Sequence, residues 1–285
     1  MLSYRHGFHA GNHADVLKHI VLVDCLQRLV LKESPLLYVD THAGAGSYRL
    51  REGYAAMNEE WAGGIERLSA AAASEEPSPE APPPAVGRYL SLVRGYGSSY
   101  PGSPAIAAGM LRPQDRLALF ELHPSDSGPL SALFAGDGRV RVVNADGFSG
   151  LRGLLPPPSR RGLVLIDPSY ELAADYDRVV EAVSTAVRRF ATGVYAIWYP
   201  LLERDEARSL PGRLARLAAK SLDVSLRIRS SRPGERGMSG SGMVVLNPPW
   251  MLRETMDEVL PWLARALGED GRAGWTVKAA PCIET

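Results

Sequence analysis

Apolar and polar residues recur along this chain with two periods. Short runs rich in Leu, Val and Ile predict buried strands at Leu36–Asp40, Leu117–Leu122, Val140–Asn144, Leu163–Asp167, Val194–Tyr199, Val224–Ile228 and Met243–Asn247. Between most of these runs, apolar residues recur at helical spacing, as in Ala174–Phe190 and Arg204–Lys220. This alternation predicts an α/β fold with a mostly parallel sheet of seven strands and helices on both faces. Because only the glycine-rich segment Ser230–Gly242 separates the last two strands, we expect them to pair antiparallel.

The chain between the first two predicted strands is longer than a nucleotide-binding βαβ unit needs. Helical patterns near Glu59–Ala70 and Val86–Tyr96 flank Ser69–Arg88, whose Ala, Pro, Ser and Glu content is typical of a loop or spacer. We therefore expect residues 1–49 and 101–285 to form the main domain, with an N-terminal arm and helix in residues 1–32. Residues 50–100 are expected to form a small helical insertion subdomain with a Pro- and Ala-rich loop.

Composition narrows the class of protein only a little. The 285 residues include 32 basic and 32 acidic side chains, so a nucleic-acid partner would have to bind a local basic face. Cys25 and Cys282 form neither a disulfide framework nor a zinc-binding spacing. No apolar run is long enough to cross a membrane. We expect a cytoplasmic, monomeric protein without a membrane partner.

Histidines are concentrated near the N-terminus, at His6, His9, His13 and His19. No CxxC or HExxH accompanies them, so we expect no metal site. Asn12 is a natural N-cap for a helix that runs to about Lys32. The buried stripe of this helix is expected to consist of Val16, Ile20, Val23 and Val30. We expect His19 at the edge of this stripe and Lys18 on a more exposed face of the helix. The aromatic and basic residues before the helix suit either RNA recognition or an arm packed on the domain.

Acidic residues follow successive predicted strands. The first strand leads into Asp40–Gly46, whose small residues let backbone amides approach a ligand. Glu121 follows the second strand, where a carboxylate can accept hydrogen bonds from both ribose hydroxyls of a nucleoside. Asp146 follows the third and can accept from the amine of an adenine. Arg49 stands where a dinucleotide fingerprint needs a third glycine, which disfavours a nicotinamide cofactor.

Each of these acids alone also suits a loop or a helix cap, and the ordered set is what favours a cofactor site. Ser103 is similarly open to two interpretations. With Pro104 after it, Ser103 is a natural N-cap, and its hydroxyl also faces the cofactor loop.

The fourth of these strands ends in Asp167-Pro168-Ser169-Tyr170. This segment resembles the Asp/Asn-Pro-Pro-Tyr/Phe signature of methyltransferases that modify amino groups of bases, chiefly adenine N6. The Asp167 carboxylate and the Pro168 carbonyl could each accept one amine hydrogen, and Tyr170 could stack on the base. The alternative is an ordinary strand end followed by a turn.

The whole chain resembles the ribosomal large RNA subunit methyltransferase J family. The N-terminal segment Met1–His19 is the most specific match, and further matches are YVDTHAGAG at Tyr38–Gly46, YPGSP at Tyr100–Pro104, ELHPSD at Glu121–Asp126, ADGF at Ala145–Phe148, SRRGLVLIDPSY at Ser159–Tyr170, FATGVYAIWYP at Phe190–Pro200 and RGMSGSGMVVLNPPW at Arg236–Trp250. The resemblance implies a Rossmann-like, S-adenosylmethionine-dependent methyltransferase fold with a helical insertion. It also implies N6-methylation of one adenine in 23S ribosomal RNA, naked or in an assembly particle.

The resemblance implies roles for individual residues. Asp167 would orient the target amine, Lys18 would support the catalytic pocket, and Tyr4 and His6 would meet the RNA. Contacts with S-adenosylmethionine are implied at His19, His42, Ser103, Glu121, Asp146, Gly147 and Asp167. The family has a second proline where this chain has Ser169, so we expect a more flexible loop and at most a modest loss of rate.

Several alternatives stay open. A DNA adenine methyltransferase and a non-catalytic RNA-binding protein would both retain this fold. The second motif, Asn247–Trp250, follows the last strand, so we interpret it as structural. Three arginines lie near the predicted final turn, and they are Arg229, Arg232 and Arg236. They either contact RNA phosphates or only solvate the turn.

Overall fold

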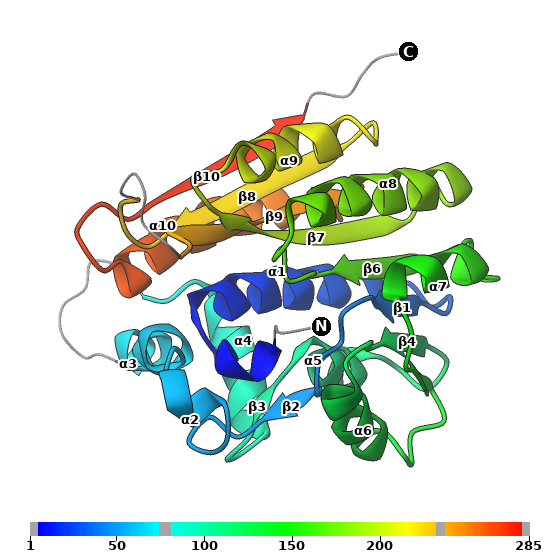
Figure 1. Ribbon diagram of the computed structural model, residues 1–285, viewed down its shortest axis with the longest axis horizontal. Coiled ribbons are helices and arrows are strands. Elements are labelled where there is room, and N and C mark those ends of the chain that lie inside the picture. Colours follow the sequence, from blue (N-terminus) through cyan, green and yellow to red (C-terminus); the bar gives the residue numbers. More distant parts are fainter. Residues whose placement is uncertain (1–4, 74–80, 232–236, 281–285) are drawn as a thin grey trace.

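A computed structural model of the chain describes residues 5–73, 81–231 and 237–280 (Figure 1). Its centre is an eight-stranded sheet in the order β10-β8-β9-β7-β6-β1-β4-β5. The strands are β1 Leu37–Asp40, β4 Arg116–Phe120, β5 Val140–Val143, β6 Gly162–Ile166, β7 Val194–Leu201, β8 Ser221–Arg227, β9 Gly240–Leu246 and β10 Gly274–Ala280.

The sheet is parallel from β5 to β7 and antiparallel beyond it. The predicted antiparallel pairing of β8 and β9 is confirmed, and so is the α/β, Rossmann-like fold class. The predicted number of strands was one too low, because β10 pairs with β8 at the edge of the sheet. Since β10 is only partly buried, it lacks the continuous apolar run that marks the inner strands.

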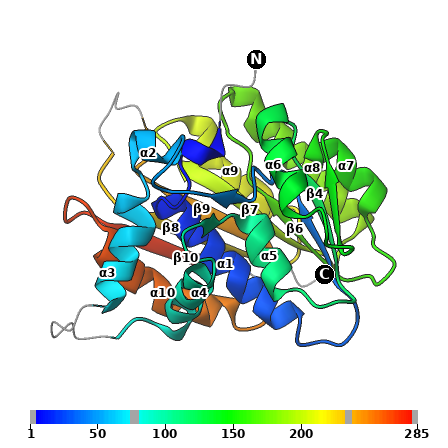
Figure 2. The ribbon, with the colours of Figure 1, turned by 90° about the horizontal axis from the view of Figure 1, so that it is seen from below.

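Helices cover both faces of this sheet. One face carries α7 Gly147–Leu154, α8 Ala173–Arg189 and α9 Asp205–Ala215. The other carries α1 His13–Leu29, α5 Ser103–Met110, α6 Pro124–Leu133 and α10 Leu252–Leu267. Figure 2 shows α1, α4 and α10 grouped on the same side of the molecule. Helices on both faces of a mostly parallel sheet are typical of an α/β fold.

Helix α1 begins as predicted, because the Asn12 side chain accepts hydrogen bonds from the amides of Ala14 and Asp15. It ends at Leu29, one turn before the predicted Lys32. The expected exposed face was wrong. Strand β9 and helices α4, α5 and α10 surround α1, so Lys18 is 3% exposed and His19 is fully buried.

The long segment after β1 returns to the main sheet through a small antiparallel pair, β2 Ser47–Tyr48 and β3 Tyr100–Pro101. Between them lie α2 Ala55–Asn58, a π-helical turn η2 Ala62–Glu66, α3 Arg67–Ala73 and α4 Pro84–Gly95. Helix α4 packs on both α1 and α10, η2 packs on α1, and α3 packs on α10. The division of the chain into two domains stays a prediction, and part of the expected Pro- and Ala-rich loop lies outside the described residues.

The described residues contain neither a helix that could span a membrane nor a cluster of metal-ligating side chains. None of their helices combines the length and apolar character that crossing a membrane requires. Within residues 5–73, 81–231 and 237–280, no group of three or more His, Cys, Asp or Glu side chains is arranged to hold a metal ion.

Candidate active site

The carboxyl ends of β6, β1, β4 and β5 meet at one edge of the sheet, where Asp167, Asp40, Glu121 and Asp146 follow one another in the order of these strands. A cavity of about 590 Å³ opens there. It is lined by His6, Thr41, His42, Gly44, Glu121, Leu122, His123, Asp126, Asp146, Gly147, Phe148, Asp167, Pro168, Ser169, Glu171, Leu172, Asp175 and Arg178. The parallel sheet thus brings together most of the residues that the sequence assigned to a cofactor.

Asp40 is buried beneath this cavity and organises the first loop. Its carboxylate accepts hydrogen bonds from the Ser103 hydroxyl at 2.6 Å, the Tyr38 hydroxyl at 2.9 Å and the His42 amide at 3.2 Å. Burial raises the pKa of Asp40. The predicted capping role of Ser103 was wrong, because Gly102 is the N-cap of α5 and Ser103 is its first residue. Ser103 instead ties α5 to β1.

Glu121 fastens the glycine loop to the end of β4. Its two oxygens accept from the Gly44 amide at 2.8 Å and the His123 amide at 2.6 Å. Burial raises the pKa of Glu121 despite these bonds. Gly44 has a φ of +59°, and a Cβ there would lie 2.3 Å from the Tyr48 hydroxyl. Only glycine therefore lets the backbone pass at this point.

Asp146 is the N-cap of α7 and also lines the cavity, so a capping role does not exclude a role toward a cofactor. It accepts from the Ser149 amide at 3.2 Å and the Ser149 hydroxyl at 2.6 Å. Burial opposes the ionisation of Asp146, but the bonds from Ser149 outweigh it and lower its pKa. The next residue must be small, because a Cβ on Gly147 would lie 2.2 Å from the Thr41 carbonyl oxygen.

His42 lines the cavity beside this cap. Its ring stands edge-on to that of Phe148, with the centroids 5.1 Å apart. Burial lowers the pKa of His42 to about 4. The ring is therefore neutral at neutral pH and can donate or accept a hydrogen bond without carrying charge.

Asp167 lies at the end of a buried chain of charges. Its Oδ2 is 2.5 Å from Lys18 Nζ, which is also 2.8 Å from Asp15 Oδ1. The Asp15 carboxylate accepts from the Gly11 amide at 2.9 Å and lies 3.1 Å from His6 Nε2. This network connects the N-terminal arm to the carboxyl end of β6. Lys18, which was expected to support the catalytic pocket, contacts Asp167 directly.

The charges within this network support one another. Burial opposes ionisation of both Asp15 and Lys18, yet the pKa of Asp15 is lowered by His6 and Lys18. The pKa of Lys18 is raised by Asp15 and Asp167. Asp15, which is 2% exposed, was not predicted from the sequence as part of the site. The signal available was its position three residues before Lys18, a spacing that places oppositely charged side chains together on a helix.

A second cavity of about 210 Å³ lies on the other side of Asp167. Its polar lining comes mainly from the N-terminal arm and α1, and its apolar wall comes from Trp198, Pro200, Leu202 and Met238. His6, Asp167 and Ser169 line both cavities. The apolar wall was not predicted from the sequence. Trp198 precedes α9 and β8 in the chain and Met238 follows them, so the two residues meet only in the fold.

Tyr170 does not face either cavity. Its φ of +51° turns the ring inward, where its hydroxyl donates to the Trp198 carbonyl at 2.8 Å and its centroid lies 4.7 Å from that of Tyr176. The side chain is 3% exposed. The expected stacking of Tyr170 on a base is therefore wrong for this arrangement, in which the ring anchors the turn after β6.

The remaining predicted site residues differ in position. His19 lines neither the 590 Å³ nor the 210 Å³ cavity; its Nδ1 lies 3.0 Å from the Tyr100 hydroxyl. Tyr4, Arg232 and Arg236 lie outside the described residues. Arg229 donates to the Met238 carbonyl. Asn247 donates to the carbonyls of Ala191 and Gly193, which agrees with the structural role predicted for it.

A mostly parallel sheet with acidic residues after successive strands, a glycine loop and an Asp-Pro turn defines a Rossmann-like methyltransferase. Residues 33–279 match the family described as "Ribosomal RNA large subunit methyltransferase D, RlmJ". The chain belongs to this family of ribosomal RNA methyltransferases.

Individual relatives agree with this assignment. The chain is 47% identical to "Ribosomal RNA large subunit methyltransferase J" of Haemophilus influenzae, with 98% of each chain covered. It is 45% identical to the protein of the same name from Escherichia coli, covering 97% of this chain and 98% of the relative. A crystal structure of a Legionella pneumophila protein superposes with a TM-score of 0.85 at 33% identity, covering 95% of this chain and 98% of that one.

Proposed function

We propose that this protein transfers a methyl group from S-adenosylmethionine to N6 of one adenine in 23S ribosomal RNA. The observation that carries the proposal is that Asp167 lines both the 590 Å³ cavity and the 210 Å³ cavity. A methyl donor in the larger cavity and a base in the smaller one would meet at this carboxylate. The names of the two curated relatives support RNA of the large ribosomal subunit as the substrate.

The lining of the larger cavity fits a sulfonium cofactor. Carboxylates outnumber arginines in it, and they are Glu121, Asp126, Asp146, Asp167, Glu171 and Asp175. They attract a positively charged sulfur and an amino group, and they repel a pyrophosphate. Glu121 is positioned to accept from ribose hydroxyls, and Asp146 beside the Phe148 ring suits an adenine. This lining argues against a nicotinamide dinucleotide.

The smaller cavity fits an unstacked base. The Trp198 ring and the Met238 and Pro200 side chains offer apolar surface, while His6, His9 and Asn12 offer hydrogen-bonding groups on the opposite side. Sequence-specific RNA recognition commonly uses such a combination of apolar contact and polar edges on a base that has left its helix.

Bound S-adenosylmethionine would supply an electrophilic methyl group on a positively charged sulfur. Lys18 holds Asp167 through Oδ2, which leaves Oδ1 for the target amine. Oδ1 and the Pro168 carbonyl would accept the two amine hydrogens and favour the tetrahedral geometry that attack requires. The amine can lose its proton after the methyl group has been added, so no general base is needed before attack.

The test is methyl transfer from labelled S-adenosylmethionine to unmodified large-subunit RNA, followed by nucleoside analysis. We expect N6-methyladenosine at one site, and a loss of about 100-fold or more in Asp167→Ala, because that variant removes the acceptor oxygens of the side chain. Asn247→Ala is the matched control, since it alters the other Asn/Asp-Pro motif of the chain. A larger loss in a folded Asn247→Ala protein would reverse the assignment of the two motifs.

Two further outcomes would replace the proposal. Methylation of adenine in duplex DNA, with none in the RNA, would indicate a DNA methyltransferase. Binding of RNA without turnover, in a protein that does not bind S-adenosylmethionine, would indicate a non-catalytic RNA-binding protein.

A further inference from the structure

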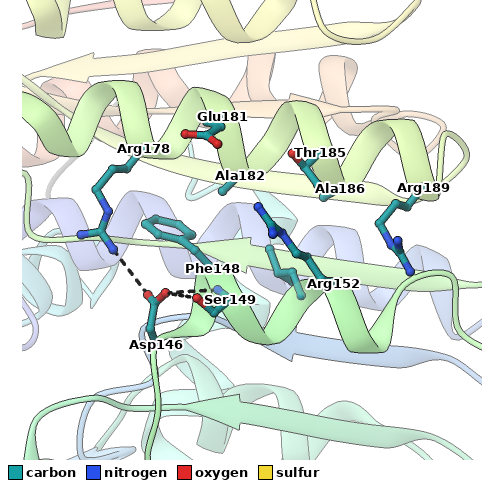
Figure 3. Close-up of a pocket in the computed structure, with 11 residues that line it drawn as sticks. Asp146, Phe148, Ser149, Arg152, Arg178, Glu181, Ala182, Thr185, Ala186 and Arg189 are labelled. Atoms are coloured by element: carbon teal, nitrogen blue, oxygen red, sulfur yellow. Dashed lines mark hydrogen bonds and ion pairs between the residues drawn. The ribbon is translucent and has the colours of Figure 1, made fainter.

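A third cavity, of about 230 Å³, lies between α7 and α8. We call it the arginine groove, because Arg152 on α7 and Arg178 and Arg189 on α8 border it (Figure 3). The rest of its lining is Asp146, Phe148, Ser149, Leu151, Glu181, Ala182, Thr185 and Ala186. No role proposed above uses Arg152 or Arg189.

The groove is continuous with the cofactor cavity. Asp146, Phe148 and Arg178 line both. At this shared end, Arg178 Nη2 lies 3.6 Å from Asp146 Oδ1, and its guanidinium carbon lies 5.5 Å from the centre of the Phe148 ring. Arg178 is therefore committed to the protein, and Arg189 lies at the opposite end of the groove (Figure 3).

The other two arginines keep most of their donors for a ligand. Arg189 Nε donates to the Leu155 carbonyl at 3.1 Å, which orients its guanidinium. Arg152 makes no hydrogen bond or ion pair with any residue that the structure describes. An arginine presents five N–H donors, so both side chains retain the capacity to bind an anion.

The length of the groove favours a polymer over a small anion. Arg178 and Arg189 are eleven positions apart on α8, and at 1.5 Å per residue this is roughly 16 Å. A single phosphate cannot reach both ends of the groove. A nucleic-acid strand carries a charge every few ångströms, so several of its phosphates fit this length. Asp146 and Glu181 in the lining offset part of the positive charge, and the three arginines remain in excess over these two carboxylates.

We infer that the arginine groove binds backbone phosphates of the RNA strand that flanks the target adenine. This inference rests on the proposed function, because it takes RNA as the substrate. Phosphate contacts fix the position of a nucleic acid without reading its sequence. The groove would therefore hold the flanking strand while the base enters the cavity beside Asp167, and it would contribute to RNA affinity without touching the reacting atoms.

The test is the double variant Arg152→Gln/Arg189→Gln. RNA affinity is measured as a function of salt for a long substrate and for one trimmed to the target loop. For the long RNA we expect binding about tenfold weaker and a log–log salt slope reduced by about 1.5, for two lost phosphate contacts. For the trimmed RNA we expect wild-type affinity. Cofactor affinity and the rate at saturating RNA should remain unchanged.

Arg253→Gln is the matched control, because Arg253 is an exposed arginine on α10, on the other face of the sheet, with Asp257 3.7 Å away. Unchanged affinity and salt slope of the double variant for the long RNA would overturn the inference. So would equal losses on the long and trimmed RNAs, or an equal loss in Arg253→Gln. If the wild type methylates no adenine in RNA, the proposed function fails instead, and the two failures are therefore distinguishable.

Discussion

Replacing Lys18 by methionine should destabilise the fold strongly, because Lys18 supplies the cation that Asp15 and Asp167 share. Its Nζ lies 2.8 Å from Asp15 Oδ1 and 2.5 Å from Asp167 Oδ2. The substitution keeps an unbranched side chain of similar size, so little packing is lost. What changes is the charge. Asp15, which is 2% exposed, would retain the His6 ring, the Gly11 amide and, at 3.8 Å, His19 Nε2 as polar neighbours, but no lysine.

The magnitude follows from this geometry. Two unit charges 2.8 Å apart attract by about 6 kcal/mol at an effective dielectric constant of about 20. The cost of removing the charge from solvent offsets part of this attraction, and removing one partner of a buried pair costs about 3–5 kcal/mol in practice. We therefore expect Lys18→Met to lower the free energy of unfolding by about 3–5 kcal/mol, a large share of the roughly 5–15 kcal/mol typical of a folded domain.

The assay is denaturant unfolding at neutral pH of the wild type, Lys18→Met, Asp15→Asn and the double variant. If Lys18 and Asp15 interact as described, the double variant should lose at least about 1 kcal/mol less than the sum of the single losses. A loss below about 1 kcal/mol in Lys18→Met, or strict additivity of the two substitutions, would refute a charged Asp15–Lys18 pair.

Three further predictions address other parts of the site. Burial lowers the pKa values of His13 and His42 to about 4 and that of His19 to about 3. The unfolded chain therefore binds more protons below pH 6.5, and the free energy of unfolding should fall between pH 6.5 and 5 by up to about 1.4 kcal/mol per pH unit for each histidine; a pH-independent value would contradict this. Glu121→Gln should weaken binding of S-adenosylmethionine by about 10- to 100-fold in calorimetry, because it removes a charged acceptor; wild-type affinity would exclude Glu121 from the cofactor site. Tyr170→Phe should cost about 1 kcal/mol of stability through the lost bond to Trp198 and leave RNA affinity unchanged; a selective loss of RNA affinity would restore the stacking role.

Much of the cofactor edge could be predicted because it depends on local patterns. Strands β1, β4, β5 and β6 are short apolar runs, and an acid stands at or within three residues of the end of each, as with Glu121 after β4 and Asp167 after β6. Parallel strands bring their carboxyl ends to the same edge of a sheet. Local patterns and this one rule were therefore enough to predict that these residues converge.

The largest departures occur where a residue's environment is set by distant segments. Helix α1 has the sequence of an ordinary helix with one apolar stripe, but helices from the segment between β2 and β3 pack on it and Lys18 contacts Asp167 at the end of β6. This burial converts Asp15 and Lys18 from surface charges into a paired network. Strand β10 was missed for a related reason, since only its pairing with β8 distinguishes it from a polar tail.

The sequence by itself determined the α/β class, the order of the acidic strand ends and the Asp-Pro turn, because these depend on neighbouring residues and on the regular geometry of parallel strands. The tertiary structure decided the burial of Lys18, the inward orientation of Tyr170 and the apolar wall of the second cavity. Each of these depends on contacts between segments far apart in the chain. No local pattern of residues specifies which of those segments will meet.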